Sequence, residues 1–320
     1  MAEITEIKEK IAAVLVNPRV LVLGGAGFIG GNVANALHTA GAKVIIGTRN
    51  PSTTEKRLMA SLVNCEHRKI QFENCLSDAT WLQLLDNVDV VVNCVGILRE
   101  RGNETYSSVH CEAPASLAAA CEQKSIRLIH ISALGLNQPH RSRFLTSKIA
   151  GEMALKSSGA DYFIIRPSLL EGNGGFGAQW IRKLARLPIH LVPAKALGDI
   201  SPLSVTDLGQ AIANLVTITV DKNSTVLDRE FDLGGLEIRN MAQYMAAIRS
   251  YYGAPAVVLS VPSWLARLGS HICDVLHFSP FSFGHWELLN CNNVPTRNRL
   301  AELLGRAPTP VWPTCKNNHN

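Results

Sequence analysis

Hydrophobic residues in the first half of the chain occur in short runs that are rich in valine and isoleucine. The runs are Arg19–Leu23, Lys43–Ile46, Ile70–Phe72, Val88–Val92, Ile126–Ile131 and Tyr162–Ile165. Continuous β-branched runs of this length are typical of strands buried on both faces of a sheet. Because helical stretches separate the six runs, the pattern predicts an α/β fold with a doubly wound parallel sheet.

The stretches between and after these runs show the periodicity of amphipathic helices. We expect helices at 4–15, 28–38, 80–85, 106–122, 144–156, 178–187, 206–216, 241–252 and 264–276. Beyond Arg166-Pro167 the elements become shorter and less regular. We therefore expect a doubly wound domain at 1–167. A smaller, irregular substrate-side or partner region would occupy 168–320, with some of its segments returning to the first domain.

Composition and charge restrict the class of protein further. The 320 residues are 47% hydrophobic, which is enough for a large core, and the net charge of +5 comes from scattered side chains. Without a run of basic residues, no nucleic-acid partner is expected. Charged residues interrupt every apolar stretch, and the acidic N-terminus differs from a signal peptide, so we expect a cytoplasmic chain without a membrane span. Eight cysteines without metal-ligand spacing indicate reduced thiols and no metal.

The first strand ends in a glycine-rich turn that satisfies the spacing G-x-G-x-x-G. The turn reads Gly24-Gly-Ala-Gly27-Phe28-Ile29-Gly30, and a helix follows it. In this context the early glycines permit a tight turn, Gly27 allows the backbone to approach a pyrophosphate, and Gly30 allows the helix to pack closely on the strand. The helix N-terminus favours an anion. The sequence therefore predicts a Rossmann-type dinucleotide site, and a tight turn without a ligand is the alternative.

The end of the second strand bears on which dinucleotide binds. An Asp or Glu at this place would hydrogen-bond the ribose 2′-hydroxyl of NAD. The chain instead has Thr48-Arg49, with Arg57 further on. Because a guanidinium pairs bidentately with a phosphate, Arg49 favours the 2′-phosphate, and we expect NADP(H), with NAD(H) as the alternative. A solvated arginine in a loop is the other interpretation of this residue.

These residues resemble the short-chain dehydrogenase/reductase superfamily, in the extended and atypical branches that include nucleotide-sugar epimerases. Most of the chain takes part in the resemblance. The matching segments are 24–30, 88–96, 128–133, 148–152, 164–172 and 202–207. The segment 202–207, together with 231–235 and 286–294, looks closest to the subgroup that contains the NADPH-binding accessory subunit of respiratory complex I and its bacterial relatives.

The resemblance implies roles for several residues. Phe28 and Ile29 would lie beside the diphosphate, and Lys148 would bond the nicotinamide ribose. The other contacts it implies are Val95 and Gly96 beneath the adenosine and Pro167 at the nicotinamide end. The chain departs from the family at Asn74-Cys75, where relatives show Gly-Asp, so adenine contacts there are in question.

The same resemblance supplies a test of catalytic chemistry. Active relatives place a tyrosine four residues before the lysine, and the ammonium lowers the pKa of the phenol so that it can transfer a proton. Here the tyrosine position is Phe144, and the position of the partner hydroxyl is Ala133. Ser132, one residue earlier, and Lys148 remain as the candidate catalytic residues. A phenyl ring has no proton to give, so the catalytic pair is absent.

Two functions are compatible with these residues. The first is an NADP(H)-binding structural or regulatory protein within a redox-linked assembly, and the second is an NAD(P)-dependent reductase or nucleotide-sugar epimerase that uses water or Ser132 as its proton source. We expect the first. His110 and Glu171 are expected at the edge of the pocket, whereas Asp161, Asp199 and Asp207 form no evident acid/base pair.

Near the C-terminus, bulky side chains form one stripe on the helix expected at 264–276. The stripe consists of Trp264, Leu265, Leu268, Ile272, Val275 and Leu276, with Phe278, Phe281 and Phe283 close by. Most stripes of this kind are part of a core, so we expect packing against the first domain. The alternative is docking to a protein partner or to a membrane surface, which would make the protein peripheral to that membrane.

Overall fold

The computed structural model describes residues 17–54, 58–194, 196, 198–217, 229–253, 255–276 and 282–311. The helix expected at 4–15, Arg57, Phe278 and Phe281 lie outside these residues. Among the residues within them, no helix is both long enough and apolar enough to cross a bilayer.

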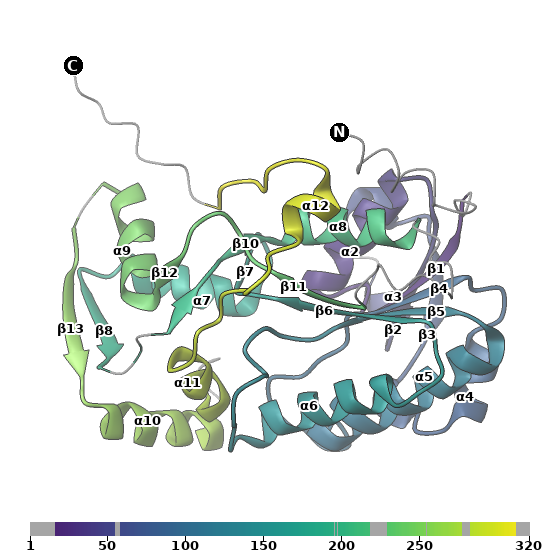
Figure 1. Cartoon of the computed structure of the whole chain (residues 1–320), viewed down its shortest axis with the longest axis horizontal. Coiled ribbons are helices and arrows are strands. Elements are labelled where there is room, and N and C mark those ends of the chain that lie inside the picture. Colours follow the sequence, from purple (N-terminus) through teal and green to yellow (C-terminus); the bar gives the residue numbers. More distant parts are fainter. Residues whose placement is uncertain are drawn as a thin grey trace.

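Seven parallel strands form the central sheet, in the spatial order β11-β6-β5-β4-β1-β2-β3 (Figure 1). They are β1 (Arg19–Leu23), β2 (Lys43–Thr48), β3 (Glu66–Lys69), β4 (Val90–Asn93), β5 (Arg127–Ile131), β6 (Tyr162–Pro167) and β11 (Glu230–Leu233). The chain proceeds from β1 to β2 and β3 on one side, and later to β4, β5 and β6 on the other. This reversal opens a crevice at the carboxyl ends of β1 and β4. The doubly wound α/β fold is confirmed.

Helices cover both faces of the sheet because successive residues of each buried strand point in opposite directions. Val20 and Val22 of β1 belong to a core with the helices of one face, whereas Leu21 and Leu23 belong to a second core on the other face. The first layer contains α2 (Phe28–Thr39), α8 (Val205–Val216) and α12 (Leu300–Leu304). The second contains α4 (Asp78–Leu84), α5 (Ala113–Lys124) and α6 (Arg143–Lys156).

One strand differs from its expected position. The apolar run at Ile70–Phe72 is not a strand, because β3 is the polar segment Glu66–Lys69 that precedes it. As an edge strand, β3 pairs only with β2, and its side chains are exposed or half-buried. Ile70 and Phe72 enter the core directly after the strand ends. The hydrophobic run at 70–72 therefore corresponds to the residues that pack in the core, whereas the hydrogen-bonded strand is the polar segment before it.

Several segments beyond residue 168 return to the first domain. Helix α8 packs on α2, and β11 extends the sheet beside β6. The other segments build a smaller lobe that lies to one side of the sheet in Figure 1. Its helices are α7 (Phe176–Ala185), α9 (Met241–Tyr251), α10 (Ser263–Leu276) and α11 (Phe283–Leu289). Its strands are β7 (Leu170–Glu171), β8 (Ile189–Pro193), β9 (Asp199–Ile200), β10 (Leu203–Ser204), β12 (Arg239–Asn240) and β13 (Val257–Val261).

The stripe on α10 is placed differently from our expectation. Trp264 is 69% exposed and Leu268 is 50% exposed, and Leu265, Ile272 and Leu276 are exposed as well. The expectation that this stripe packs against the first domain is wrong. The helix faces the rest of the protein with smaller residues, since Ser270 and Cys273 are buried.

Candidate functional site

The glycine-rich turn after β1 leaves no room for larger residues. Gly24 has a φ of +71°, which side chains other than hydrogen rarely permit. A Cβ added to Gly30 would lie 2.2 Å from the carbonyl oxygen of Gly24, so only glycine lets α2 approach the strand this closely. Gly27 is the N-cap of α2, and it provides no side-chain hydrogen bond to the first helical N–H groups. These N–H groups are thus available to an anion.

A cavity of about 400 Å³ opens beside this turn, at the carboxyl ends of β1, β2 and β4. Six residues expected to bind a cofactor line it, namely Gly24, Gly27, Thr48, Arg49, Val95 and Gly96. Other lining residues include Leu23, Phe72, Glu73, Ile97, Glu104 and Val109. A volume of this size lies within the usual range of small-molecule sites. The turn and the cavity together fit a bound dinucleotide.

The remaining expected cofactor residues lie outside the lining of this cavity. The ring of Phe28 packs against the glycine-rich segment at 172–175, and Ile29 packs against the hydrophobic core that contains α2 and α8. Pro167 ends β6, where its carbonyl accepts a hydrogen bond from Leu134.

Two acidic residues in the cavity wall were missed in the sequence. Glu73 lines the cavity, whereas its neighbour Asn74 bonds Gln71 and Cys75 is buried in the core. In the sequence, the position of Glu73 directly before Asn74-Cys75 could have indicated that Glu73 lies near the cofactor site. Glu104 also lines the cavity, from a loop 55 residues away from its partner Arg49. No motif marks such a distant loop residue.

Arg49 and Glu104 form an ion pair at the wall of the cavity. The side chain of Arg49 is 65% exposed and that of Glu104 is 21% exposed. An exposed pair of this kind contributes about 0–1 kcal/mol, so a phosphate can replace the carboxylate at small cost. Arg49 thus lies where a ligand in the cavity can reach its guanidinium.

Lys148 lies on α6, below the loop that follows β4. Its Nζ is 3.9 Å from the place where a Cβ on Gly96 would stand, and 5.7 Å from the centre of the Phe144 ring. Within the described residues, Nζ makes no hydrogen bond or ion pair. Burial lowers the pKa of Lys148 to about 8, while the Glu152 carboxylate acts in the opposite direction. The ammonium is therefore available to a ligand group that reaches past Gly96.

His110 is buried beside Lys148 and is neutral. Burial, reinforced by the charge of Lys148, lowers the pKa of His110 to about 2. Its Nε2 accepts a hydrogen bond from the backbone N–H of Ile97, so Nδ1 carries the proton and donates it to the hydroxyl of Ser147. That hydroxyl in turn donates to the carbonyl of Phe144. Each polar atom of the ring thus has a partner, and His110 has no proton left for a substrate.

Phe144 lies within a cluster of aromatic rings. Tyr106, His110 and His285 lie around it, with ring centres 5.6 to 5.9 Å from its own. Only Tyr106 among these rings has a phenolic hydroxyl, and it donates to the carbonyl of Leu98. Burial and neighbouring carboxylates raise the pKa of Tyr106 to about 12. The hydroxyl of Tyr106 is therefore a poor substitute for the missing acid.

Ser132 belongs to a buried ionic network rather than to the cavity wall. Its hydroxyl donates to the Glu152 carboxylate at 2.5 Å. Glu152 also receives hydrogen bonds from the guanidinium of Arg166, which reaches Glu230 and Asp232 as well. The network links α6, β6, β11 and the residue that directly follows β5. The proton of Ser132 is thus used inside the fold.

The other candidate residues have structural partners. Glu171 is buried between Tyr244 and Arg182, so it connects α7 and α9 instead of edging the cavity. Asp161 pairs with Arg127, and Asp207 pairs with Arg306. No group of three or more His, Cys, Asp or Glu that could hold a metal occurs among the described residues.

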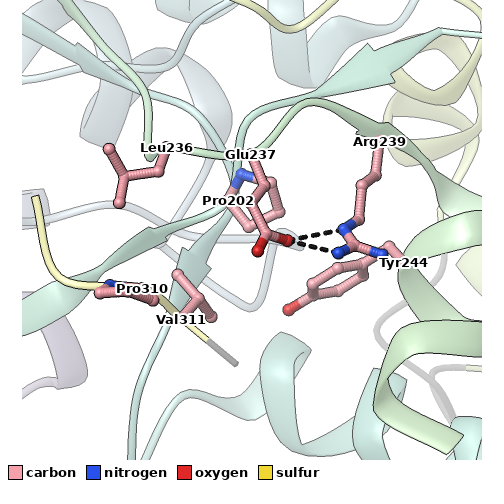
Figure 2. Close-up of a pocket in the computed structure, with 7 residues that line it drawn as sticks. All are labelled: Pro202, Leu236, Glu237, Arg239, Tyr244, Pro310 and Val311. Atoms are coloured by element: carbon pink, nitrogen blue, oxygen red, sulfur yellow. Dashed lines mark hydrogen bonds and ion pairs between the residues drawn. The ribbon is translucent and has the colours of Figure 1, made fainter. Parts of the chain in front are cut away.

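A second, much smaller pocket lies in the other lobe. Figure 2 shows it beside the ion pair of Glu237 and Arg239, with Tyr244 and Pro202 in its wall. Its volume is about 10 Å³. Since a single water needs about this much space, the pocket is too small for a substrate or cofactor. The cavity beside the glycine turn is therefore the better candidate site.

Comparison with known proteins agrees with this fold and site. Residues 20–203 match the NAD dependent epimerase/dehydratase family. The match covers more than half of the chain, and it includes the glycine turn and six of the seven strands of the central sheet. The chain belongs to this family, and its fold is that of an NAD(P)-binding protein.

Curated relatives include subunits of respiratory complex I. Subunit 9 of the NADH dehydrogenase [ubiquinone] 1 alpha subcomplex from mitochondria of Rattus norvegicus is 28% identical over 77% of this chain and 66% of its own length. The 40 kDa subunit of mitochondrial NADH-ubiquinone oxidoreductase from Neurospora crassa is 24% identical over 61% of the chain and 51% of its own length. The expected resemblance to this subgroup is confirmed. The chain spans less than two thirds of either relative.

A further relative and two solved structures have enzyme names. Ceramide reductase from Caulobacter vibrioides is 25% identical over 62% of the chain and 59% of its own length. A nucleoside-diphosphate-sugar epimerase from Staphylococcus aureus superimposes with a TM-score of 0.68 at 15% identity, over 92% of this chain and 98% of its own. An NADPH-dependent quinone oxidoreductase from Escherichia coli superimposes with a TM-score of 0.67 at 14% identity, over 91% of this chain and 96% of its own. At these identities the two structures show the fold alone.

Proposed function

We propose that the chain binds NADP(H) as a tightly held, fold-stabilising ligand and turns it over little, as a structural or regulatory part of a redox-linked assembly. The observation that carries this proposal is the place of Phe144. It occupies the position expected for the catalytic tyrosine, it has no acidic proton, and the rings around it supply none. General acid/base help contributes roughly 10²–10⁴-fold in rate, so its loss leaves little catalysis.

The cofactor half of the site supports binding. The turn at Gly24, Gly27 and Gly30 with the N–H groups at the start of α2 suits the diphosphate, and Val95 and Gly96, which line the cavity, would lie beneath the adenosine. Phe28 and Ile29 hold the turn against its neighbours. Lys148 would donate to the nicotinamide ribose, and the nicotinamide would lie toward Pro167. The bound group supplies hydride chemistry, while these residues bind and orient it.

The preference for NADP over NAD rests on Arg49. Its guanidinium faces the cavity beside Thr48, and its present partner Glu104 holds it with a weak, exposed ion pair. A 2′-phosphate carries more charge than one carboxylate and accepts bidentate hydrogen bonds, so it would displace Glu104. A ribose 2′-hydroxyl has no such advantage.

Participation in an assembly is supported by the named relatives. The rat and Neurospora proteins are subunits of a respiratory complex. We infer that this chain likewise works as an accessory subunit. Its location would then be the cytoplasmic side of a membrane, with 168–320, which contains the smaller lobe, as the partner region and 1–167 as the cofactor domain.

An NAD(P)-dependent reductase or epimerase is the second candidate, and Lys148 is the observation in its favour. The lysine keeps its position beside Gly96 with a free ammonium, as an active enzyme requires. Ser132 would have to leave Glu152 before it could donate a proton, which disfavours it as the acid. An ordered water would then remain as the proton source.

The binding proposal is tested by denaturing freshly purified protein and identifying any released nucleotide by mass spectrometry and absorbance. We expect NADP(H) in near-stoichiometric amount. The Arg49→Ala variant should release less NADP(H), and Arg143→Ala, which alters another exposed arginine that pairs with a glutamate, should not differ. Protein that contains no nucleotide and binds none on addition would contradict the proposal.

A further inference from the structure

The second lobe contains two long stretches without any acidic residue. Neither 172–198 nor 238–273 includes an aspartate or glutamate, although the whole chain has 26 of them. The two stretches contain seven basic residues, which are Arg182, Lys183, Arg186, Lys195, Arg239, Arg249 and Arg267. They form α7, β8, α9, β13 and most of α10. Two of the seven, Arg182 and Arg239, pair with Glu171 and Glu237 at the borders of the stretches, and the others have no acidic residue within either stretch to balance them.

The same lobe exposes large apolar side chains over adjacent elements. Strands β8 and β13 pair in parallel, and Leu191 and Val257 on them are 66% and 60% exposed. Helix α10 begins two residues after β13 ends, and its Trp264, Leu268 and Leu276 are 69%, 50% and 63% exposed. We call the exposed side of these three elements the α10–β13 face. Soluble proteins rarely expose this many large apolar side chains on elements that follow one another or pair.

The orientation of α10 shows that this exposure is a feature of the fold. An amphipathic helix normally buries its bulky stripe and exposes small or polar residues. Here Ser270 and Cys273 are buried, while Trp264 and Ile272 point outward. Rotating the helix would bury the stripe, but Asp274 fixes the rotation because it accepts the backbone N–H of Phe283 and pairs with Arg99.

We propose that the α10–β13 face docks on the surface of a bilayer that contains anionic phospholipids. The apolar side chains would enter the interfacial region, where tryptophan is favoured. Lys183, Arg186 and Arg267 are exposed on neighbouring elements and would contact headgroup phosphates. The basic and bulky apolar residues match an anionic lipid surface, because the one carboxylate on α10, that of Asp274, already pairs with Arg99. A second copy of the chain would instead bring like charges together.

The geometry leaves the cofactor cavity accessible in this position. In Figure 1, β13 and α10 form the outer boundary of the second lobe, and the strands β2 and β3 lie at the opposite end of the molecule. The cavity is lined by residues of β1 and β2 and of the segments that follow β1, β2, β3 and β4, and by none of α10 or β13. Lipid docking and nucleotide binding can thus be changed separately.

Vesicle sedimentation tests the proposal. Full-length protein is mixed with vesicles of phosphatidylcholine alone or of phosphatidylcholine with phosphatidylglycerol. We expect binding to the anionic vesicles at least about ten-fold tighter, because each basic residue near the surface adds attraction, and we expect salt to weaken it. The Trp264→Ser/Leu268→Ser variant should lose about ten-fold or more in affinity for anionic vesicles. Lys183→Gln/Arg267→Gln should lose the preference for anionic lipid.

Met153→Ser is the matched control, since Met153 is 62% exposed on α6, outside the α10–β13 face. It should bind vesicles as the unmodified protein does. Nucleotide affinity confirms that each variant is folded. The proposal is overturned if the unmodified protein ignores anionic vesicles or if the Trp264/Leu268 variant binds them unchanged. It is also overturned if ultracentrifugation without lipid shows a dimer that this variant dissociates, because the face then joins two copies.

Discussion

The ring of Phe144 stacks on the imidazole of His285, with centres 5.9 Å apart and planes inclined by 21°. His285 belongs to α11, and its neighbour Gly284 is so close that an added Cβ would lie 2.9 Å from the Phe144 ring. Glu287 of the same helix accepts the backbone N–H groups of Arg141 and Ser142. The chain thus covers the ring at the expected acid position with its own C-terminal segment, and a substrate would have to displace α11.

The Arg49→Ala substitution should narrow the difference in affinity between NADPH and NADH. A hydrogen bond to a charged group contributes about 1.5–3 kcal/mol, which corresponds to about 10- to 100-fold in the dissociation constant of NADPH. Affinity for NADH should change little. Fluorescence titration of both nucleotides measures this. Equal affinities in the unmodified protein would refute the preference.

Replacing the partner of Arg49 should have the opposite effect. In the Glu104→Gln variant, no carboxylate competes for the Arg49 guanidinium or repels the 2′-phosphate of NADPH. NADPH should therefore bind about two- to five-fold tighter, which corresponds to the small energy of an exposed ion pair. The same titration shows it, with NADH as the internal reference. Weaker NADPH binding would mean that Glu104 assists the ligand instead of competing with it.

Lys148→Met should stabilise the nucleotide-free protein while weakening NADPH binding. The folded-state pKa of Lys148 is about 8, below the ordinary 10.5, so folding carries a penalty that is complete below pH 8 and disappears between pH 8 and 10.5. Removing the charge should raise Tm by a few °C at pH 7, on the order expected for 1–2 kcal/mol, and the gain should shrink above pH 8. Thermal unfolding at several pH values tests this. A lower Tm at pH 7 would show that the ammonium stabilises the fold.

Glu152→Gln should lower the free energy of unfolding, although Glu152 is not among the residues expected to contact the cofactor. It removes a buried charge that holds Arg166 and Ser132, and breaking a buried pair costs about 3–5 kcal/mol. Because Arg166 keeps Glu230 and Asp232, the loss should be at the lower end of this range. Urea unfolding measures it. The comparison is Asp86→Asn, because the Asp86 carboxylate is 69% exposed and pairs with Lys124 at the surface. This substitution should cost much less than Glu152→Gln, and equal losses would contradict the assignment.

The parts of the fold that follow from local patterns were predictable from the sequence. Buried strands such as β4 contain continuous apolar runs, here Val90–Val92, and Gly30 has to be glycine because helix and strand touch there. The hydrophobic pattern did not predict edge strand β3, because its residues are polar and its side chains are exposed or half-buried. The exposed stripe of α10 and the ion pair of Arg49 with Glu104 depend on contacts between residues far apart in the sequence. The local periodicity of hydrophobic residues gives no information about such contacts.

The most direct test of the account is NADPH consumption by the unmodified protein, followed across a panel of carbonyl and sugar-nucleotide substrates. The comparison is Phe144→Tyr with Ala133→Ser, which restores both missing hydroxyls but leaves α11 in place. We predict that the unmodified protein binds NADPH and consumes none above the no-enzyme rate, and that the double variant gains at most partial activity. Robust turnover by the unmodified protein would contradict the structural role and favour the enzyme.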